Sequence, residues 1–482
     1  MPDKNDNSVM SRIVSLCKRR GFVYPSAEIY GGTGSVWDFG PLGVLLKNNI
    51  KNEWWRAMVQ ENADIVGIDS SVITRREVLK ASGHEQGFVD PLVECKICHT
   101  RFRADQPETI SDHFTQTHKD KTPEGNITDA RAFNLMFKTF MGPVADDENM
   151  AYLRPETAQG IFVNFKNILE SSRGKLPFGI AQIGKSFRNE ITPGNFIFRT
   201  REFEQMEMEF FVNPDEAESY YKKWIEERFN WYKDLGIKQE NLRLRPHAEE
   251  ELAHYAMAAT DVEYKFPFGW SELEGIANRQ DFDLQTHEKH SGRDLKYFDE
   301  ETKKKFWPYV VEPAAGVDRA ALAFLVDAYE EKNQKSNIKN QNNGMSSTSS
   351  DNNYSLSEDN SESKGNNKKQ ERAEGETVLH FHPKLAPIKA AVFPLVKKDK
   401  LPEIARGIYD DLKKHYMVQY DESGSVGRRY RRQDEIGTPW CITVDFDSLD
   451  DKTVTVRDRD TMEQERIEIK NIKTFIEEKL EG

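Results

Sequence analysis

Two absences first narrow the class of protein. The 482-residue chain has no apolar run of about eighteen residues, the length that a membrane-spanning helix needs. Its first residues, Met1–Ser8, are polar and lack the apolar core of a secretory signal peptide. The sequence therefore argues against a membrane protein and against an exported one.

Cysteine and net positive charge are also scarce. The chain has only 4 cysteines, and the neighbouring pair Cys95 and Cys98 makes no disulfide framework, which favours the reducing cytoplasm. The formal net charge is −13, which argues against a protein that coats nucleic acid indiscriminately. A local basic stripe can still bind nucleic acid, and one lies near the C-terminus at Arg428, Arg429, Arg431 and Arg432.

One internal stretch has almost no aromatic residues. From Asn333 to Lys369 the chain is mostly Asn, Ser, Lys, Gln, Asp and Glu, with Tyr354 as the only aromatic residue. Such a stretch cannot bury enough apolar surface to offset its ordering entropy. We interpret residues 332–375 as a disordered polar tether between two folded parts, residues 1–331 and 376–482.

The part after the tether alternates short apolar runs with a helical pattern. Three runs are typical of strands, and one segment has helical spacing: Val378–Phe381, Ala390–Phe393, Trp440–Phe446, and the helix marked by Ile404, Ile408 and Leu412. This alternation predicts a small α/β domain with a mixed or parallel sheet.

The part before the tether combines helices with longer strands. Thr157–Ser172 is predicted to be one helix that Thr157 caps and Gly174 ends, with an apolar face marked by Ile161, Phe162, Phe165, Ile168 and Leu169. A strand is predicted from Phe198 to Val212, and its side chains alternate between two faces. Even positions give an apolar face and odd positions a polar one: Met206, Met208, Phe210 and Val212, against Arg199, Arg201, Phe203, Gln205 and Glu207.

The polar face has two interpretations. Guanidinium groups suit phosphate oxygens and an aromatic ring suits a stacked base, so the face can receive a planar anionic ligand. A solvated outer face with salt bridges is the more common outcome for a run of charges. The preceding run, Phe178 to Phe187-Arg188-Asn189-Glu190, predicts a partner strand, because the intervening Ile191–Ile197 contains Pro193 and Gly194.

Several segments together resemble a known family. FRNE followed by Arg199-x-x-x-Phe203 is similar to the second signature motif of class II aminoacyl-tRNA synthetases, and GVDRA, with Arg319 in the first turn of a helix after the strand Trp307–Val311, to the third. The segments YGGTGSVWDFGPLGVLLKNNI, RPETAQG, VEPAAGVDRA and GRRYRRQDEIGTP resemble glycyl-tRNA synthetases of the homodimeric type. The similarity extends from Val14 to Phe446, apart from the tether.

The resemblance implies an α+β catalytic domain, an antiparallel sheet with flanking helices, followed by a C-terminal α/β anticodon-binding domain. It also implies a homodimer and the substrates glycine, ATP with Mg²⁺, and tRNA(Gly). Insertions are expected at about residues 91–130, where zinc is a candidate ligand, and at about residues 213–262, where a helical insertion is expected. The non-catalytic alternative is a synthetase-like accessory subunit that binds nucleic acid. A synthetase for another small amino acid is a second alternative.

The resemblance assigns catalytic roles to Arg188, Glu272 and Arg319. Arg188 is expected at the α-phosphate and the glycine carboxylate, Arg199 and Arg319 at the γ-phosphate, and Glu272 at Mg²⁺. Phe203 is expected to stack on adenine and Glu190 to accept from its amino group. The complete ATP set is Arg188, Asn189, Glu190, Phe198, Arg199, Thr200, Arg201, Glu202, Phe203, Glu272, Leu273, Gly316, Val317, Asp318 and Arg319.

A glycine pocket must supply negative charge for an ammonium and exclude a methyl group. The resemblance offers Glu156, Glu207 and Glu312 for the ammonium, with Arg103 to balance them; isolated carboxylates in such a group repel one another or take up protons. For each residue alone, a structural salt bridge is the more common role. The complete glycine set is Arg103, Glu156, Phe203, Glu204, Gln205, Met206, Glu207, Glu312, Pro313, Ala314, Ala315 and Gly316.

Two departures and one metal question accompany the resemblance. Ala314 stands where the family usually has serine, and Gly316 is the only glycine leading into the third motif. Cys95-x-x-Cys98 with His113 and His118 is spaced like a Cys2His2 zinc site, whereas zinc-binding relatives usually offer a second cysteine pair. Either the four residues bind a structural Zn²⁺, or they are two free thiols and two surface histidines.

Overall fold

The computed structural model describes residues 8–253, 255–332 and 376–481, so the predicted tether lies, from residue 333 on, outside the described residues. The contacts divide the described chain into two units. The first unit holds the described residues of Met1–Asp327, Phe381–Lys389 and Lys473–Gly482, and the second those of Ala328–His380 and Ala390–Ile472. No helix in these three ranges is long and apolar enough to cross a membrane.

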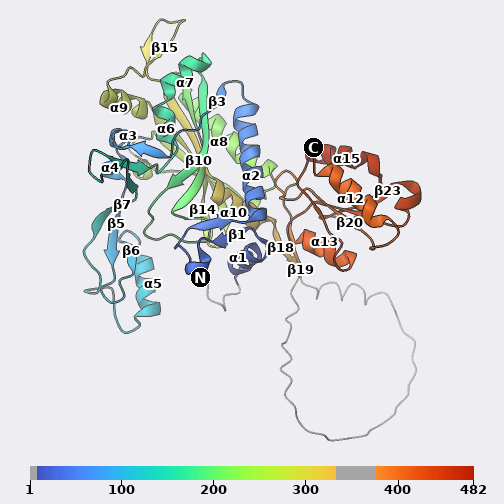
Figure 1. The fold of residues 1–482 in the computed structure, drawn as a ribbon. Helices are drawn as coiled ribbons and strands as arrows, with labels where there is room; N and C mark the ends of the chain where they lie inside the picture. Colours follow the sequence, from blue (N-terminus) through green and yellow to red (C-terminus); the bar gives the residue numbers. More distant parts are fainter. Residues whose placement is uncertain (1–7, 254, 333–375, 482) are drawn as a thin grey trace. The chain divides into compact units, whose positions relative to one another are not determined.

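A seven-stranded sheet forms the centre of the first unit (Figure 1). All neighbouring strands are antiparallel except the pair β10 and β3. The strands, in spatial order, are β12 (Leu242–Pro246), β13 (Ala258–Phe266), β14 (Gly269–Gln280), β17 (Tyr309–Gly316), β11 (Glu202–Val212), β10 (Phe178–Phe187) and β3 (Ile65–Gly67).

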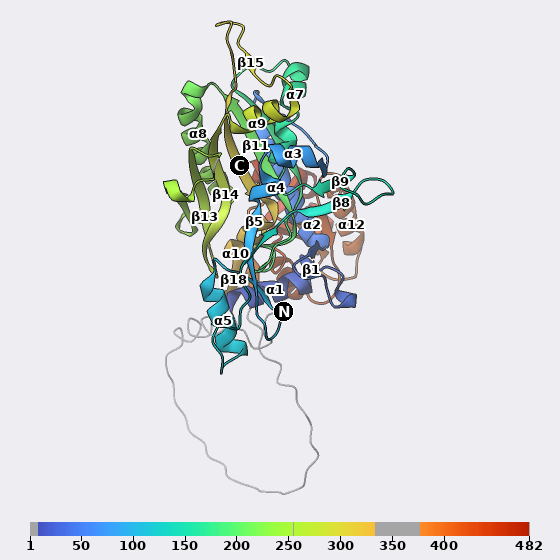
Figure 2. The same ribbon diagram turned by 90° about the vertical axis from the view of Figure 1, so that its left-hand side faces the viewer.

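Strand β11 explains why the two faces of the sheet differ. Its even-numbered face, including Met206, Met208 and Phe210, is buried, and Phe210 contacts Trp224 of helix α8 (Ala217–Asp234) with ring centroids 5.3 Å apart. On the odd face, Phe211 contacts Phe165 at 4.5 Å. Helices thus cover the even face along β11, while on the odd face they cover only its far end. Figure 2 shows α8 beside β13 and β14.

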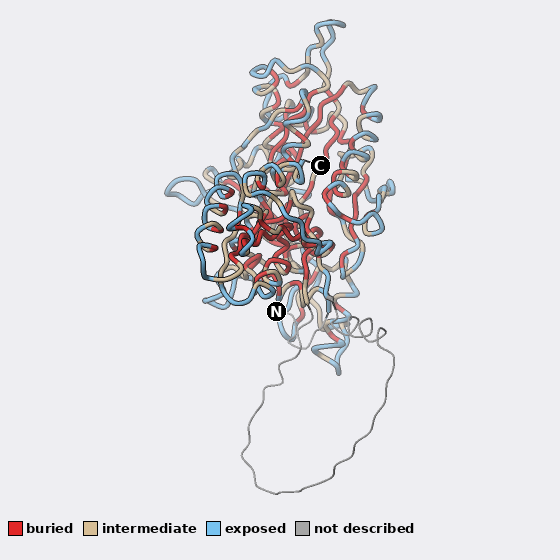
Figure 3. The backbone as a smooth tube through the Cα atoms, turned by 90° about the vertical axis from the view of Figure 1, so that its right-hand side faces the viewer, coloured by how far each residue is buried: buried red, intermediate tan, exposed pale blue. Residues whose placement is uncertain are grey.

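Further helices and shorter strands complete the first unit. Figure 3 shows buried chain through the interiors and exposed chain in the outer turns. The helices are α1 (Val9–Arg20), α2 (Pro41–Trp55), α3 (Arg76–Ala81), α4 (His84–Gly87), α5 (Pro107–Thr117), α6 (Ala158–Phe162), α7 (Phe165–Ser172), α9 (Phe282–Ser291), α10 (Val317–Ala328) and α15 (Ile472–Glu481). The shorter strands are β1 (Val23–Pro25), β2 (Trp37–Phe39), β4 (Ile73–Arg75), β5 (Val89–Glu94), β6 (Arg101–Arg103), β7 (Arg131–Asn134), β8 (Phe137–Phe140), β9 (Met150–Leu153), β15 (Tyr297–Phe298) and β16 (Lys305–Phe306).

The predicted helix Thr157–Ser172 is two helices, α6 and α7. The chain departs from helical geometry between Phe162 and Phe165. Thr157 does not cap α6, because its hydroxyl donates to the Glu207 carboxylate instead. The expected apolar face nevertheless forms: Ile161, Phe162 and Phe165 are buried against β10 and β11 in one core cluster.

Three other boundaries differ from the sequence prediction. Strand β11 begins at Glu202, not Phe198, because Asn195 and Phe196 have positive φ angles of 55° and 61° that turn the chain before it enters the sheet. Strand β17 continues to Gly316, five residues beyond the predicted end at Val311. Segment 213–262 is not purely helical: after α8 it supplies β12 and begins β13, both strands of the central sheet.

The second unit contains a five-stranded mixed sheet, as its alternating pattern predicted. Strand β20 is parallel to both neighbours, and the remaining pairs are antiparallel. The first predicted strand, Val378–Phe381, does not join this sheet. Strand β19 (Glu376–Leu379) forms there instead and pairs with β18 (Tyr329–Lys332). The sheet and helices are β21 (Val418–Tyr420), β20 (Ala390–Pro394), β22 (Trp440–Val444), β23 (Thr453–Asp458), β24 (Gln464–Glu468), α12 (Leu401–Leu412), α13 (Val426–Asp434) and α14 (Ser448–Asp451).

The four arginines of the basic stripe do not form one surface. They lie on helix α13, whose turns point them in different directions. Arg429 is buried and donates to the carbonyl oxygens of Pro394 and Gly424, and Arg432 pairs with Asp421. Arg428 and Arg431 are exposed, and Arg431 contacts Glu376. Exposed and buried arginines alternate here because successive side chains of a helix point in different directions around its axis.

Helix α2 packs unusually closely on the chain before it. A Cβ atom added at Gly43 would lie 1.8 Å from the carbonyl oxygen of Phe22, which is backbone and cannot rotate away. By contrast, Gly407 in the exposed face of α12 has no atom within 4 Å of such a Cβ. The close approach of α2 to Phe22 therefore requires a glycine at position 43, whereas no neighbouring atom requires one at position 407.

We expect Gly43→Ala to destabilise the first unit by about 3 kcal/mol, because α2 must move away from Phe22. Gly407→Ala should stabilise α12 by about 0.5–1 kcal/mol, because alanine has the higher helix propensity. Calorimetric unfolding of both variants checks this. A Gly43→Ala protein that melts like the unsubstituted protein would show that α2 is not held against Phe22.

Candidate active site

A cavity of about 330 Å³ opens on the odd face of β11, in the part that helices leave uncovered. Strands β11, β14 and β17 form its floor, and the β10–β11 connection forms one wall. Sixteen residues predicted for ATP or glycine line it: Glu156, Arg188, Glu190, Phe198, Arg199, Thr200, Phe203, Gln205, Glu207, Glu272, Glu312, Ala314, Ala315, Gly316, Asp318 and Arg319.

Strand register determines which of these residues are neighbours. Glu207 of β11 lies opposite Ala314 of β17, which in turn lies opposite Gly275 of β14. Glu312 lies opposite Ala277. Carboxylates and very small side chains therefore share one end of the floor, which leaves room for a small cationic ligand there.

Arginines and aromatic rings line the other end of the cavity. Arg319, in the first turn of α10, is 3.1 Å from Glu272, and its guanidinium carbon stands 4.6 Å from the centre of the Phe198 ring. Arg199 is paired with Glu190 at 2.8 Å. Because each arginine has a carboxylate partner, an entering anion must compete with that partner for the guanidinium group.

Arg188 joins the two ends. Its Nε donates to the carbonyl oxygen of Pro155 at 3.0 Å, directly before Glu156. Its guanidinium carbon is 5.3 Å from the ring centres of both Phe88 and Phe203. Phe203 thus faces Arg188, whereas Phe198 is the ring that contacts Arg319.

Nine predicted residues do not reach the cavity. Met206, Leu273 and Val317 are fully buried in the apolar core. Glu204 points to the opposite face of β11, toward Lys47 and Lys51, because side chains alternate along a strand. The others have partners or places elsewhere: Arg103 with Asp90 and Asp105, Glu202 with Lys185, Arg201 with the carbonyl oxygens of Gly34 and Glu190, Asn189 with that of Leu135, and Pro313 buried within β17.

Arg279 supplies positive charge beside the cluster of Glu156, Glu207 and Glu312. The sequence did not single this residue out. It is buried at the end of β14, contacts Glu312, and donates to both oxygens of Asp283 at 2.8 and 2.9 Å. Its guanidinium carbon lies 3.8 Å from the centre of the Tyr255 ring, which lines the cavity. The four-residue spacing to Asp283 was the only signal in the sequence, and such a pair is common on any helix.

A second buried network holds Glu156. Its oxygens accept from Gln159 at 3.0 Å and contact His84 at 3.2 Å. Gln159 also donates to Asp283 at 3.1 Å, and its oxygen lies 2.8 Å from the ring nitrogen of His287. The carboxylates of Glu156 and Glu312 are therefore oriented by one connected set of side chains.

The carboxylates differ in their acidity. Burial alone raises the pKa of Glu156, but His84 and Arg279 outweigh it and hold that pKa below the ordinary value. Burial, with the neighbouring Glu312 and Glu156, raises the pKa of Glu207 to about 8. Burial raises the pKa of Glu312 to about 7, against the opposing effect of Arg279. Near neutral pH the group therefore holds protons that a bound cation would displace.

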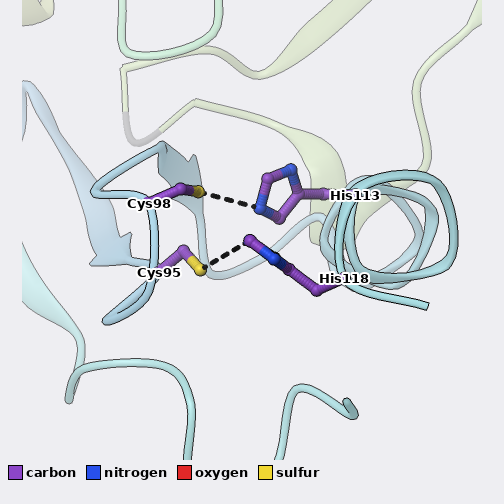
Figure 4. Close-up of side chains that lie close together, drawn as sticks. All are labelled: Cys95, Cys98, His113 and His118. Atoms are coloured by element: carbon purple, nitrogen blue, oxygen red, sulfur yellow. Dashed lines mark hydrogen bonds between the residues drawn. The ribbon is translucent and has the colours of Figure 1, made fainter. Parts of the chain in front are cut away.

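The four candidate zinc ligands come together outside this cavity (Figure 4). The Cys95 sulfur is 3.7 Å from Nε2 of His118, and the Cys98 sulfur is 3.3 Å from Nε2 of His113. All four donor atoms lie within 4.8 Å of one another. Helix α5 brings the histidines to the turn after β5, which carries the cysteines.

Two family models match the chain. Residues 138–342 match the tRNA synthetase class II core domain (G, H, P, S and T), and residues 389–479 match an anticodon binding domain. These matches confirm the predicted fold class, a class II catalytic core followed by an anticodon-binding domain.

Similar proteins extend over almost the whole chain. It is 51% identical to a glycine–tRNA ligase of Thermobifida fusca (strain YX), over 99% of both chains. Identity is 52% to that of Bifidobacterium longum (strain NCC 2705), over 97% of this chain and 92% of the relative. It is also 52% to that of Caldanaerobacter subterraneus subsp. tengcongensis, over 98% of each. The chain therefore belongs to the glycine–tRNA ligase family of class II aminoacyl-tRNA synthetases.

Proposed function

We propose that this protein activates glycine with ATP to glycyl-adenylate and then transfers the glycyl group to the 3′ end of tRNA(Gly). The observation that carries the proposal is the division of one cavity into a carboxylate end with a floor of Ala314 and Gly275 and an arginine end with the half-buried rings of Phe198 and Phe203. The first end suits an ammonium without a side chain, and the second suits a nucleoside triphosphate. Arg188 stands between them, where the two substrates must react.

Activation needs positioning and charge stabilisation more than a base. The glycine carboxylate is already ionised at neutral pH, so it attacks the α-phosphate without losing a proton, and the bond from the α-phosphorus to the β-phosphate oxygen breaks to release pyrophosphate. We assign Arg188 to the α-phosphate and the glycine carboxylate, and Arg199 and Arg319 to the outer phosphates. Guanidinium groups placed there stabilise the negative charge that develops during in-line displacement.

The Mg²⁺ that accompanies ATP finds a suitable oxygen ligand in Glu272. Its carboxylate is 45% exposed and faces the cavity beside Arg319, as a hard oxygen ligand for a phosphate-bound cation requires. Magnesium bound there would neutralise part of the triphosphate charge. Glu272 itself would leave Arg319 when ATP enters and so free that guanidinium for phosphate.

Specificity for glycine depends on the small side chains of the cavity floor and on the lack of a hydroxyl group there. Ala314 lacks the hydroxyl that the family serine would offer, so the ammonium depends on Glu156, Glu207 and Glu312. Arg279 and His84 offset two of these carboxylates, a balance that the sequence assigned to Arg103. We propose that Arg279 is the residue that allows Glu312 to remain ionised beside Glu207 in the occupied pocket.

Membership of the family supports a proposal for the remaining partners. We propose that the second unit recognises the anticodon arm of tRNA(Gly), that the active form is a homodimer, and that the protein acts in the cytoplasm. Its four cysteines form no disulfide, as expected in a reducing compartment. On helix α13, Arg428 and Arg431 are the exposed arginines available for phosphate contacts.

We also propose that Cys95, Cys98, His113 and His118 bind one structural Zn²⁺. Tetrahedral zinc with bonds of about 2.3 Å to sulfur and about 2.1 Å to nitrogen separates a sulfur from a nitrogen by roughly 3.6 Å. The two sulfur–nitrogen distances, 3.7 and 3.3 Å, are close to that value. The pKa of Cys98 is lowered to about 5, first by the Thr100 hydroxyl and then by His118, which favours the thiolate that binds metal.

Arg319→Ala should lower glycine-dependent pyrophosphate exchange by about 100-fold or more, since a charge-assisted phosphate contact in the transition state is lost. Arg243 is a matched control. It also pairs with a glutamate, Glu263, and lies over a ring, Trp270 at 4.5 Å, but does not line the cavity. Near-normal exchange in a folded Arg319→Ala protein, or an equal loss in Arg243→Ala, would remove Arg319 from the reaction.

The KM for glycine should fall by about tenfold or more between pH 6 and pH 8. The sign follows from the raised pKa values of Glu207 and Glu312, about 8 and about 7. Both groups hold protons at low pH, whereas an ammonium favours their ionised forms, so binding releases protons. Calorimetry in two buffers of different ionisation enthalpy measures that release, and the KM for ATP provides the comparison. Glycine binding without proton release would contradict the assignment of the carboxylates.

Purified protein should contain about one zinc ion per chain, and His113→Ala should lower that content to near zero. His99→Ala is the matched control, because this exposed histidine lies beside Cys98 but contacts Glu94 rather than the four-residue cluster. Elemental analysis after dialysis measures both. Equal zinc in the two variants would mean that the cluster is not the metal site.

A further inference from the structure

A buried lysine lies on the face of β11 opposite the cavity. Lys47 belongs to α2 and is 6% exposed. Its ammonium donates to Asp318 at 2.7 Å, contacts Glu204 at 3.1 Å, and stands 4.2 Å from the centre of the Phe39 ring. A buried ammonium with three such partners is held in one position, since moving it would leave charges unpaired away from water.

Asp318 connects that lysine to the cavity. It occupies the first turn of α10, directly before Arg319, and lines the cavity wall. While one carboxylate oxygen accepts from Lys47, the other accepts from the backbone N–H of Glu204 at 2.9 Å. The carboxylate thereby joins the beginning of α10 to β11 between Phe203 and Gln205, two residues that line the cavity.

The local charges are balanced. Glu204 and Asp318 are two carboxylates, and Lys47 and Lys51 are two ammonium groups of the same helix. Within the described part of the chain, Glu204 is the carboxylate that Lys51 contacts, at 3.1 Å, and Lys51 is more exposed than Lys47. Lys47 is therefore the only one of the two lysines that compensates Asp318, the carboxylate nearer to the expected phosphates.

We propose that Lys47 is a positioning residue for ATP: by holding Asp318, it fixes the first turn of α10 so that Arg319 faces the triphosphate. Burial alone lowers the pKa of Lys47, but Asp318 and Glu204 outweigh it and raise that pKa above the ordinary value, so the residue keeps its charge. Without that charge, Asp318 would present an uncompensated carboxylate beside ATP and repel it. The glycine end, at Glu207 and Glu312, is farther along the same strands and should be affected less.

Lys47→Met tests this role through its separate effects on the KM for ATP and the KM for glycine. We expect the KM for ATP in pyrophosphate exchange to rise about tenfold or more, and the KM for glycine to change less than about threefold, because only the ATP end loses its support. Lys47→Arg, which keeps the charge, should recover at least part of the ATP affinity. An unchanged KM for ATP in folded Lys47→Met, or an equal rise for both substrates, would overturn the proposal.

Lys51→Met is the matched control, because it removes the same charge from the same helix and from Glu204 but not from Asp318. Its KM for ATP should stay near that of the unsubstituted protein; an effect equal to that of Lys47→Met would overturn the proposal. If Lys47→Met does not fold, Lys47→Gln takes its place. The glutamine amide can still donate to Asp318 without a charge, and it should give the same selective rise.

The inference rests on the proposed ATP role of Arg319, and the two can fail separately. If Arg319→Ala exchanges pyrophosphate normally, the ATP assignment fails, whatever Lys47→Met does. If Arg319→Ala is inactive while Lys47→Met and Lys47→Gln bind ATP normally, the ATP assignment stands and the positioning role of Lys47 is wrong.

Discussion

The pairing of β11 with β17, and of β17 with β14, is the constraint on which the rest of the site depends. Adjacent antiparallel strands have fixed partners, and a shift of one residue would turn every side chain to the other face. In this register Glu207, Ala314 and Gly275 are neighbours, and so are Glu312 and Ala277. Residues far apart in sequence thus form one floor without any loop having to order itself around a ligand.

The alternation of side chains along β11 also places several carboxylates together on its buried odd face, where protonation makes the group tolerable. On the odd face, Glu207 is followed by Glu209, which is fully buried and whose carboxylate oxygens have no hydrogen-bond partner among the described residues. Burial and the neighbouring Glu312 raise the pKa of Glu209 well above its ordinary value, which favours the protonated form. Protons thereby reduce the free-energy cost of bringing several acids together, and Arg279 opposes the protonation of Glu312.

Much of this arrangement follows from the sequence, because its signals are local. The alternation in β11 predicts that Gln205 and Glu207 share a face with Phe203, and all three line the cavity. Helical spacing predicts the apolar faces of α6 and α12. The sequence does not reveal Arg279, because its contacts with Glu312 and Tyr255 depend on strand register and not on neighbours along the chain. It misassigns Glu204 and Met206 because a run of consecutive residues was assigned to the pocket, whereas a strand turns every second one away.

The residues of β11 that point away from the cavity also contribute to the site, because they help to hold the strand. The position of a cavity residue on β11 depends on the position of the strand. Contacts on the other face of the strand help to hold it. There, Phe210 packs on Trp224 of α8, and Glu204 is bound by Lys47 and Lys51 of α2. Packing of apolar rings has little directionality, so the position of β11 along its own axis is set by its pairing with β10 and β17. Charge-assisted hydrogen bonds do have direction. The carboxylate of Asp318 accepts from Lys47 and from the backbone N–H of Glu204, so it ties the beginning of α10 to β11 beside Phe203 and supports the position that pairing with β17 sets.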